Sequence, residues 1–306
     1  MRFIQKFKMK LKVTIVIFIA IFLGLVLLLY ASGKSPNDYT NPQMATSKEI
    51  PFCNEEHIDD AEGSYEEPKL DSEPAIPDSI FEICKPAPLS GVSEQIIKKK
   101  AYIVSYNKNS KIPNWVAWHL TGEHSDGPVR RSNMFYEDEE VPQPRATNED
   151  YRGSGWSRGH MCPAGDNKWD VEAMHDSFSL INVCPQNANL NSGLWNSIEI
   201  DCRRWARQYG DIYIVCGPVF MNREHENIGE NAVFVSEAFF KVVLCLNGTP
   251  KALGFIVRNT SGNRKRDLYY NTIDQVERIT GMDFFPALPD SIENVVEAKV
   301  GLDQWR

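Results

Sequence analysis

The apolar, β-branched runs along the second half of the chain constrain the fold more than any other feature. Residues 211–220 (DIYIVCGPVF), 239–246 (FFKVVLCL) and 251–259 (KALGFIVRN) are each bounded by turn residues and have the length of buried strands. Upstream, residues 99–107 and 115–121 are strand-like, and the turn sequence KNSKIPN between them predicts a hairpin. We therefore expect several strands of one central sheet.

Helical patterns lie between and after these runs, in an order that selects the fold class. Residues 171–180 and 272–284 are predicted helices, with Thr272 as the expected N-cap of the second. In residues 191–210 apolar side chains recur at helical spacing, and Gly210 ends the predicted helix. Because strands come in succession, then a helix, then strands again, the pattern predicts an α+β fold rather than alternating βαβ units.

The N-terminus has the pattern of a membrane anchor. Residues 1–12 carry five basic side chains and no acidic one, and residues 13–30 are apolar except for Thr14. This run is just long enough to cross a bilayer as a helix, and the basic flank predicts that residues 1–12 stay cytoplasmic while the rest is exported. We favour an uncleaved anchor over a signal peptide cleaved near residues 31–33, and over a buried core helix.

The segment after the apolar run, residues 31–95, is rich in Pro, Ser, Glu and Asp and is predicted to be an acidic linker. One folded domain is expected to follow over residues 96–306. The seven cysteines fit an oxidising compartment, and their odd number leaves at least one without a partner in the chain. A disulfide between Cys53 and Cys84 could staple the linker, but spacing alone does not determine pairing.

The net charge does not by itself favour binding to nucleic acid, which usually draws on a surplus of Lys and Arg. The whole chain carries a formal charge of −8. Residues 1–95 hold 9 basic and 14 acidic side chains (9 − 14 = −5), which leaves −3 for residues 96–306. The predicted domain is thus close to neutral, and its composition is compatible with a local basic cleft.

A dense stretch over residues 154–170 (SGWSRGHMCPAGDNKWD) has neither helical nor clean strand periodicity, yet it places Arg158 and His160 two residues apart. Soon after it, residues 182–191 are rich in side-chain amides and end at Asn191, where a predicted helix begins. A strand-like turn carrying the histidine, followed by a helix carrying the asparagine, can bring both side chains to one small site.

The chemistry of these groups indicates phosphodiester hydrolysis. Amide oxygens are poor ligands for zinc but acceptable ligands for Mg²⁺, which keeps most of its waters and often takes one or two protein groups. A histidine beside such an ion can take a proton from an attacking water, because its ordinary pKa lies near neutral pH. An arginine nearby can clamp the phosphate and offset the charge of the transition state.

The same residues form part of a longer pattern. The motif WSRGH at residues 156–160 is followed by Asn182, Pro185, Gln186, Asn191, Trp195 and Glu199, and is flanked by PNWVAWHLT, VRRSNMFYEDEEVP and IYIVCGPVF. With these motifs, the chain from about residue 100 to about residue 290 resembles the DNA/RNA non-specific endonucleases, which are secreted or organellar nucleases with a ββα-metal (His-Me finger) site.

The resemblance implies a fold and an activity. The fold would be a central, mostly antiparallel sheet flanked by helices, with a ββα-metal finger as the active site. The activity would be metal-dependent cleavage of DNA and RNA with little sequence preference, which leaves 5′-phosphate and 3′-hydroxyl ends. The implied cofactor is Mg²⁺, with Mn²⁺ as the alternative.

The resemblance also implies roles at the metal and at the attacking water. His160 would be the general base that activates water. Asn191 would be the one direct protein ligand of the hydrated metal ion. Glu199, two helical turns beyond Asn191, would hold metal-bound water or orient the neighbouring groups.

Further residues are implied at the phosphate. Arg158 would contact the phosphate, and Arg131 would stabilise the pentacovalent transition state, with Arg130 as the fallback. Asn182 would support the site through hydrogen bonds. The family usually has an aspartate directly before Arg-Gly-His, whereas this chain has Ser157, which can form hydrogen bonds but brings no charge.

Other interpretations of these residues remain open at this point. Taken alone, His160 would be a core histidine, Asn191 a helix N-cap and Glu199 a surface charge. A zinc hydrolase using His160, Cys162 and Cys184 is an alternative, because thiolate and imidazole are the ligands that zinc prefers. A second alternative is a membrane-tethered nucleic-acid-binding protein with a degenerate nuclease fold.

Overall fold

The computed structural model describes residues 80–262, 264–298 and 302–305 of the 306-residue chain. These residues belong to one compact unit, Lys69–Arg306. The predicted cytoplasmic flank (1–12), the predicted membrane anchor (13–30) and most of the predicted linker (31–95) lie outside the described residues. Within the part that is described, no helix is long and apolar enough to cross a membrane.

A seven-stranded sheet forms the centre of this unit, and every neighbouring pair of its strands is antiparallel. The predicted α+β class and antiparallel sheet are therefore confirmed, as is the hairpin between residues 99–107 and 115–121. The strands, in their order across the sheet, are β1 (Gln95–Lys98), β2 (Tyr102–Asn107), β3 (Ile112–Thr121), β6 (Asp211–Val219), β9 (Ala238–Cys245), β10 (Lys251–Arg258) and β11 (Tyr270–Asn271).

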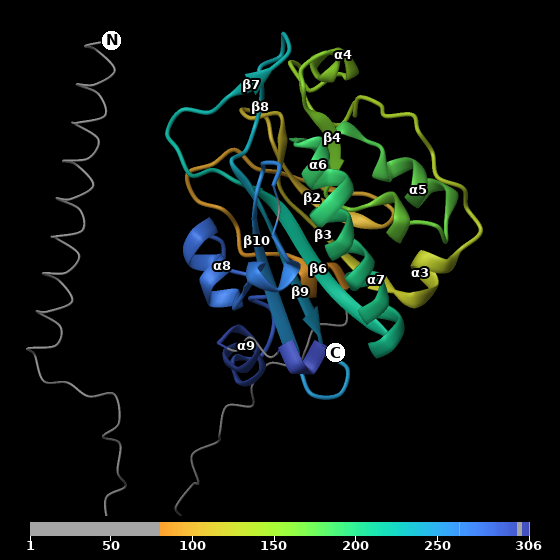
Figure 1. Ribbon diagram of the computed structural model, residues 1–306, viewed down its shortest axis with the longest axis vertical. Helices are drawn as coiled ribbons and strands as arrows, with labels where there is room; N and C mark the ends of the chain where they lie inside the picture. The colour runs from red at the N-terminus through yellow and green to blue at the C-terminus, as the bar shows by residue number, and fades with distance from the viewer. Residues whose placement is uncertain (1–79, 263, 299–301, 306) are drawn as a thin grey trace, which may run out of the picture. The chain divides into compact units, whose positions relative to one another are not determined.

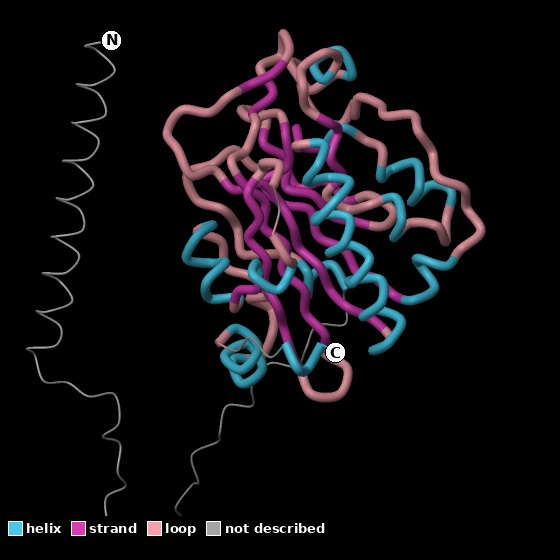
Figure 2. Tube along the Cα trace, in the orientation of Figure 1, coloured by secondary structure: helices cyan, strands magenta, loops and turns pink. Residues whose placement is uncertain are grey.

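Helices cover both faces of this sheet, as Figures 1 and 2 show. Helix α7 (Asn196–Tyr209) packs on β3 and β6, while α8 (Ile273–Thr280) and α9 (Asp290–Glu297) pack on β10. Thr272 caps α8 through a reciprocal capping box with Gln275, as its sequence predicts. The remaining helices are α2 (Ile80–Cys84), α3 (Gly122–Asp126), α4 (Asn148–Tyr151), α5 (Val171–Ser177) and α6 (Ala188–Leu190).

The sheet separates two hydrophobic cores, because successive side chains of a strand point to opposite faces. In β6, Ile212 and Ile214 belong to the core under α7, whereas Tyr213 and Val215 belong to the core under α2, α8 and α9. The first core also contains Trp195 and residues of two short strands. This face of the sheet therefore carries the segments from which the predicted site is built.

The folded unit begins earlier than the predicted boundary at residue 96. Helix α2 contacts β3, and its residues Ile83 and Cys84 are buried in the core under α8 and α9. The residues around this short apolar segment are rich in Pro, Ser and Glu, and such a composition predicts a linker rather than a helix. The end of the predicted linker is thus part of the folded domain.

Two small hairpins lie outside the main sheet. Strand β4 (Ser157–His160) pairs antiparallel with β5 (Val183–Gln186), and β7 (Asn227–Ile228) pairs with β8 (Val233–Phe234). The dense stretch around residue 158, which has no clear periodicity, is therefore a strand over four residues followed by a turn. Figure 1 shows β4 beside α6, and α6 leads into α7.

Candidate active site

The β4–β5 hairpin positions His160, the last residue of β4. In this hairpin His160 lies opposite Val183, and Gly159 lies opposite Cys184. A Cβ atom on residue 159 would come within 2.3 Å of the side-chain oxygen of Gln186 and 2.6 Å of its Cβ. Glycine at this position therefore lets the buried Gln186 side chain pack directly against the strand that carries the histidine.

The helix that follows the hairpin positions Asn191. Residues Asn191–Trp195 form one turn of π-helix between α6 and α7, and the backbone stays in the right-handed helical region at Leu190, Asn191 and Trp195. The Asn191 amide nitrogen donates to the Ser157 hydroxyl (3.4 Å), which itself donates to the backbone oxygen of Gln186 (2.7 Å). Ser157 thus links the helix to the hairpin.

Two cavities share the three residues His160, Asn191 and Arg131. The larger, of about 470 Å³, is also lined by aromatic and basic side chains that include Trp156 and Arg158. The smaller, of about 290 Å³, is also lined by Pro163, Gly165, Ser192, Asn196, Glu199 and Arg203. The histidine and the asparagine predicted to work together therefore face the same space.

Two phenylalanines and two arginines surround the imidazole. The ring of His160 lies 5.1 Å from the ring of Phe135 and 4.9 Å from that of Phe178, measured between centroids. The guanidinium of Arg158 lies 4.3 Å from the Phe135 centroid, and that of Arg131 lies 5.2 Å from the Phe178 centroid. Each phenyl ring thus contacts the histidine and a cation, an arrangement that attraction between cations and aromatic rings stabilises.

This environment keeps His160 neutral. Its side chain is only 7% exposed, and its Nε2 atom has no hydrogen-bond partner among the described residues. Burial, followed by the charges of Arg131 and Arg158, lowers the pKa of His160 to about 3. At neutral pH the imidazole therefore holds a free lone pair and can accept a proton.

Glu199 lies on α7 and is half-buried. Burial raises the pKa of Glu199 to about 7, and the charge of Lys241 is the main influence in the opposite direction. Asn191 and Glu199 are eight residues apart, which corresponds to about 80° of rotation around a regular α-helix. The π-turn adds a residue to the intervening helix and lets both side chains line one cavity.

Asn182 lies beneath the site and lines neither cavity. It is fully buried, and its side chain accepts from the backbone nitrogen of Cys162 (2.8 Å) and donates to the backbone oxygens of Cys162 and Ser177 (both 2.8 Å). These bonds fasten the turn after His160 to the segment before β5. The contacts are those of a supporting residue, without access to a bound substrate.

Arginines gather at this site although the whole chain is acidic. Arg131, Arg152 and Arg158 line the larger cavity, and Arg131 and Arg203 line the smaller one. Arg130, the sequence alternative to Arg131, lines neither cavity. Arg203 was missed in the sequence, although it follows Glu199 by four residues and so shares its helix face. It forms a salt bridge with the buried Asp166 at 2.8 Å.

The hard oxygen donors at the site fit Mg²⁺. The Asn191 amide oxygen and the Glu199 carboxylate are ligand types that Mg²⁺ accepts, and both residues line the smaller cavity. Cys162 and Cys184, proposed as zinc ligands, are fully buried, and burial raises the pKa of each thiol well above its ordinary value. The structure does not bring His160 and these two thiols together as a metal-binding group.

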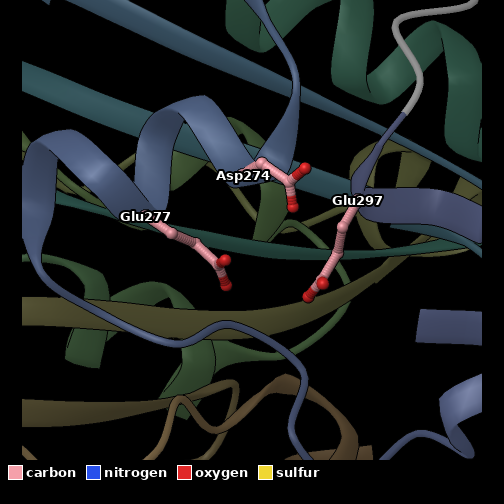
Figure 3. A group of neighbouring side chains, drawn as sticks. All are labelled: Asp274, Glu277 and Glu297. Carbon is pink, nitrogen blue, oxygen red and sulfur yellow. The ribbon is translucent and has the colours of Figure 1, made fainter. Parts of the chain in front are cut away.

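One group of three acidic side chains lies close enough together to hold a cation among the described residues. It consists of Asp274, Glu277 and Glu297, whose nearest carboxylate oxygens lie within 4.8 Å of one another (Figure 3). The group lies on α8 and α9 and includes no residue of the two cavities. Burial and the neighbouring carboxylates raise the pKa of Glu297 to about 8, so these groups repel one another when ionised.

Four other described histidines have local roles away from the cavities. His119 contacts Asp211 at 2.8 Å, and His225 contacts Glu237 at 3.1 Å. His124 stacks on Trp169, and His175 stacks on Tyr136, with ring centroids 4.8 and 4.3 Å apart. None of the four lines the two cavities around His160.

Comparison with known proteins identifies the family that the sequence motifs resemble. A family model described as DNA/RNA non-specific endonuclease matches residues 81–291. The mitochondrial nuclease EXOG of Mus musculus is 36% identical over 222 residues, which are 67% of this chain and 60% of that protein. The mitochondrial endonuclease G of Homo sapiens is 34% identical over 63% of this chain and 70% of its own length. This chain thus spans about three fifths of the EXOG relatives.

A solved structure has a similar fold. It is described as the crystal structure of an EndoG/EndoGI complex and a mechanism of EndoG inhibition. The match has a TM-score of 0.64 and 27% sequence identity, and it covers 70% of this chain and 92% of the solved one.

Proposed function

The chain belongs to the DNA/RNA non-specific endonuclease family, and on that basis we propose that it is a metal-dependent endonuclease that hydrolyses DNA and RNA with little sequence preference. The observation that carries this proposal is the cavity in which a neutral His160 faces the same space as Asn191 and Arg131. Hydrolysis of a phosphodiester requires a base, an oxygen ligand for a hard cation and a cation that binds the phosphate.

His160 acts as the general base. Its neutral imidazole takes a proton from water, and the water oxygen forms a bond to phosphorus as the bond between phosphorus and the 3′ oxygen breaks. The 3′ oxygen leaves and takes up a proton from solvent, so the products carry a 3′-hydroxyl and a 5′-phosphate. The two phenylalanines beside the imidazole limit its rotation and exclude water from one side of it.

Asn191 holds the metal, and Glu199 lies on the same cavity to bind its waters or orient its neighbours. Mg²⁺, when bound, polarises the phosphate and offsets its developing charge. The hydrogen bond from Asn191 to Ser157 involves the amide nitrogen, which leaves the amide oxygen free to face a cation. Ser157 thus orients the proposed ligand without adding a charge.

Arg131 and Arg158 contact the phosphate. Both guanidinium groups are close to His160, since each packs on a phenylalanine that contacts the imidazole. Contacts to phosphate carry no information about the bases, which accounts for the proposed lack of sequence preference. The local cluster of arginines supplies the positive charge that the whole chain, at −8, does not have.

The test is degradation of supercoiled plasmid DNA and of single-stranded RNA by the purified protein. We expect cleavage in Mg²⁺, none in EDTA, and a loss of about 10²–10⁴-fold in His160→Ala, because a general base contributes that much. His175→Ala is the matched control, since this histidine is 64% exposed and lies away from the cavities. It should keep full activity.

The same assay separates the alternatives. Cleavage that persists in EDTA, or equal activity in His160→Ala and wild type, would contradict the proposed mechanism. A degenerate binding protein would retain plasmid DNA on a filter without cutting it, with or without metal. A zinc hydrolase would be active in zinc without Mg²⁺ and would lose activity in Cys162→Ser or Cys184→Ser.

We also propose that the protein is exported and held at a membrane by residues 13–30, which lie outside the described residues. This rests on the basic flank of residues 1–12 and the apolar run that follows it. Mass spectrometry of the mature protein from the membrane fraction should find residues 1–30 attached. A mature N-terminus near residue 33 in the soluble fraction would instead indicate a cleaved signal, and delivery to an organelle would contradict export.

A further inference from the structure

The larger of the two cavities extends the active site beyond the groups proposed for the metal. Its volume of about 470 Å³ lies in the range of protein pockets that enclose a drug-sized ligand. It shares His160, Asn191 and Arg131 with the smaller cavity, so a nucleotide whose phosphate lies beside His160 has its sugar and base next to this space. The groups that line the rest of the larger cavity therefore determine whether the base is bound.

Three aromatic side chains are among the described residues that line this cavity, and they differ in the surface that they leave free. Tyr151 is only 6% exposed. Phe135 already contacts the His160 ring and the Arg158 guanidinium. Trp156 is half-buried, and within the described part of the chain no other aromatic ring or cation packs on its indole. Trp156 is therefore the aromatic side chain of this cavity that can take a further flat ring.

Contacts with other segments hold the Trp156 indole in place. The residue directly precedes β4, and its side chain packs against the core under α7. Its Nε1 atom donates to the Glu226 carboxylate (2.9 Å), and its backbone nitrogen donates to the Ser154 hydroxyl oxygen (3.1 Å). The backbone oxygen of Glu226 accepts in turn from the backbone nitrogen of Val235 (2.8 Å). The indole is thus fixed before a ligand arrives, which lowers the entropy cost of binding.

Cations surround the same cavity. Arg131, Arg152 and Arg158 all line it. Arg158 is fixed by donating to the side-chain oxygen of Asn148, whereas Arg152 is exposed and forms a salt bridge with Glu149 (2.7 Å), a surface contact that contributes little. Proteins that bind single-stranded nucleic acid without sequence preference combine an aromatic ring for the base with cations for the backbone.

We propose that the larger cavity is a nucleobase subsite, in which the base of a nucleotide adjoining the scissile phosphate stacks on the Trp156 indole. This inference rests on the proposed function for the position of that phosphate. Stacking engages a π-face that every base has, so the subsite adds affinity without adding sequence preference. Trp156 is thus a substrate-binding residue, and it acts on the base while the arginines act on the backbone.

The test measures binding rather than cleavage, by fluorescence anisotropy in EDTA. Two single-stranded probes have equal length and the same phosphates: one is oligothymidylate, and the other lacks every base. We expect the wild type to bind oligothymidylate about 10-fold more tightly than the abasic strand, within the range that one stacked base contributes. Trp156→Leu should lose most of this ratio without changing the affinity for the abasic strand. Trp156→Phe, which keeps an aromatic ring, should retain most of it.

Trp169→Leu is the matched control, since Trp169 is also half-buried but stacks on His124 and lines neither cavity. It should leave the ratio of the two affinities unchanged. A variant that folds only in part would bind both probes less well by the same factor, so the ratio separates loss of the subsite from loss of structure. Equal binding of the two probes by the wild type would overturn the proposal, as would a Trp156→Leu variant that retains the wild-type ratio.

A duplex probe tests whether the indole contacts a base or the backbone. Neighbouring bases cover both faces of a base within a duplex, so Trp156→Leu should change the affinity for the duplex by less than about 2-fold. An equal loss on the duplex and on the single strand would place the indole against the backbone and overturn the proposal. Because no cleavage is measured, a protein without nuclease activity that shows the base-dependent ratio would contradict only the proposed function.

Discussion

His160 combines burial with proximity to two cations, and both disfavour the protonated ring. An exposed histidine would be partly protonated in the pH range where most nucleases are assayed, and a protonated ring cannot accept a proton from water. The arginines that bind phosphate therefore have a second effect, since they help to keep the base unprotonated. Binding of a phosphate would partly cancel their charge and make the imidazole more basic when the proton is transferred.

We predict that His160 does not titrate between pH 5 and 8 in the free protein, because its pKa is lowered to about 3. The Hε1 chemical shift of His160, followed by NMR against pH, should stay constant over this range. Arg131→Gln should raise the pKa by removing one cation. A midpoint near the ordinary value of 6.5 in the wild type would contradict the described environment.

We predict that Asn191→Ala lowers activity at least ~100-fold, because even groups that only support metal ligands contribute 10–100-fold. Higher Mg²⁺ should recover part of this loss if the asparagine holds the ion. Asn189→Ala is the control, since this neighbouring asparagine is exposed and lines neither cavity. Equal activity of the two variants over a Mg²⁺ titration would rule out Asn191 as the ligand.

At the scale of elements, the site depends on how a hairpin and an interrupted helix meet. The β4–β5 hairpin presents His160, and the helix from α6 to α7 presents Asn191 and Glu199. The π-turn between α6 and α7 sets the rotation of one part of this helix against the other. A single residue in the turn thus determines which side chains face the cavity.

We predict that deletion of Gly193 abolishes activity without unfolding the protein. Gly193 is exposed within the π-turn, and removing one residue rotates Asn191 by about 100° relative to Glu199. Circular dichroism should show native helix content and a cooperative melt. Gly193→Ala is the control, because a Cβ there meets no atom within 4 Å and alanine favours helix, so activity should persist. An active deletion variant would show that the rotation is irrelevant.

At the scale of the whole molecule, the sheet separates the site from the acidic group on α8 and α9. His160 and α7 belong to one face, and Asp274, Glu277 and Glu297 lie with helices that pack against the other. Ionisation of the acidic group should therefore affect stability without changing the catalytic residues directly.

We predict that stability falls as the pH rises from about 4.5 to about 8 because of Glu297. Its folded pKa of about 8 exceeds the ordinary value of 4.5, so its contribution is complete below 4.5 and is lost as the pH rises through 8. The melting temperature of Glu297→Gln should depend less on pH than that of the wild type. Glu172→Gln is the control, because the Glu172 side chain is 68% exposed. Its melting temperature should depend on pH as strongly as that of the wild type. If the melting temperatures of the wild type and Glu297→Gln changed equally with pH, Glu297 would not be the cause of the loss of stability.

Much of the sheet was predictable because a buried strand can be recognised from the apolar residues within its own short segment. The runs at residues 211–220, 239–246 and 251–259 are buried on both faces, and such strands are recognised by continuous apolar residues. Helix α8 was predictable from Thr272 as a helix N-cap and from the helical pattern of the residues that follow it. Helix α2 was not, because five residues within an acidic segment have too few apolar positions to show a period.

The candidate site was predictable in part, from residue types and their spacing around His160 and Asn191. Arg203 could have been found from its spacing to Glu199. Phe135 had no such signal, because it reaches the imidazole from a segment without regular structure. Its role depends on the course of a loop, and the sequence of this loop has no repeating pattern from which that course could be predicted.

The sequence by itself determined the fold class, most strands and the family to which the chain belongs, because apolar periodicity and short motifs act over a few neighbouring residues. Only the tertiary structure decided which groups are removed from water and which charges face one another. Burial and electrostatic coupling depend on segments far apart in the chain, such as β3 beneath α7. The neutral His160 and the Arg203–Asp166 salt bridge are consequences of that packing.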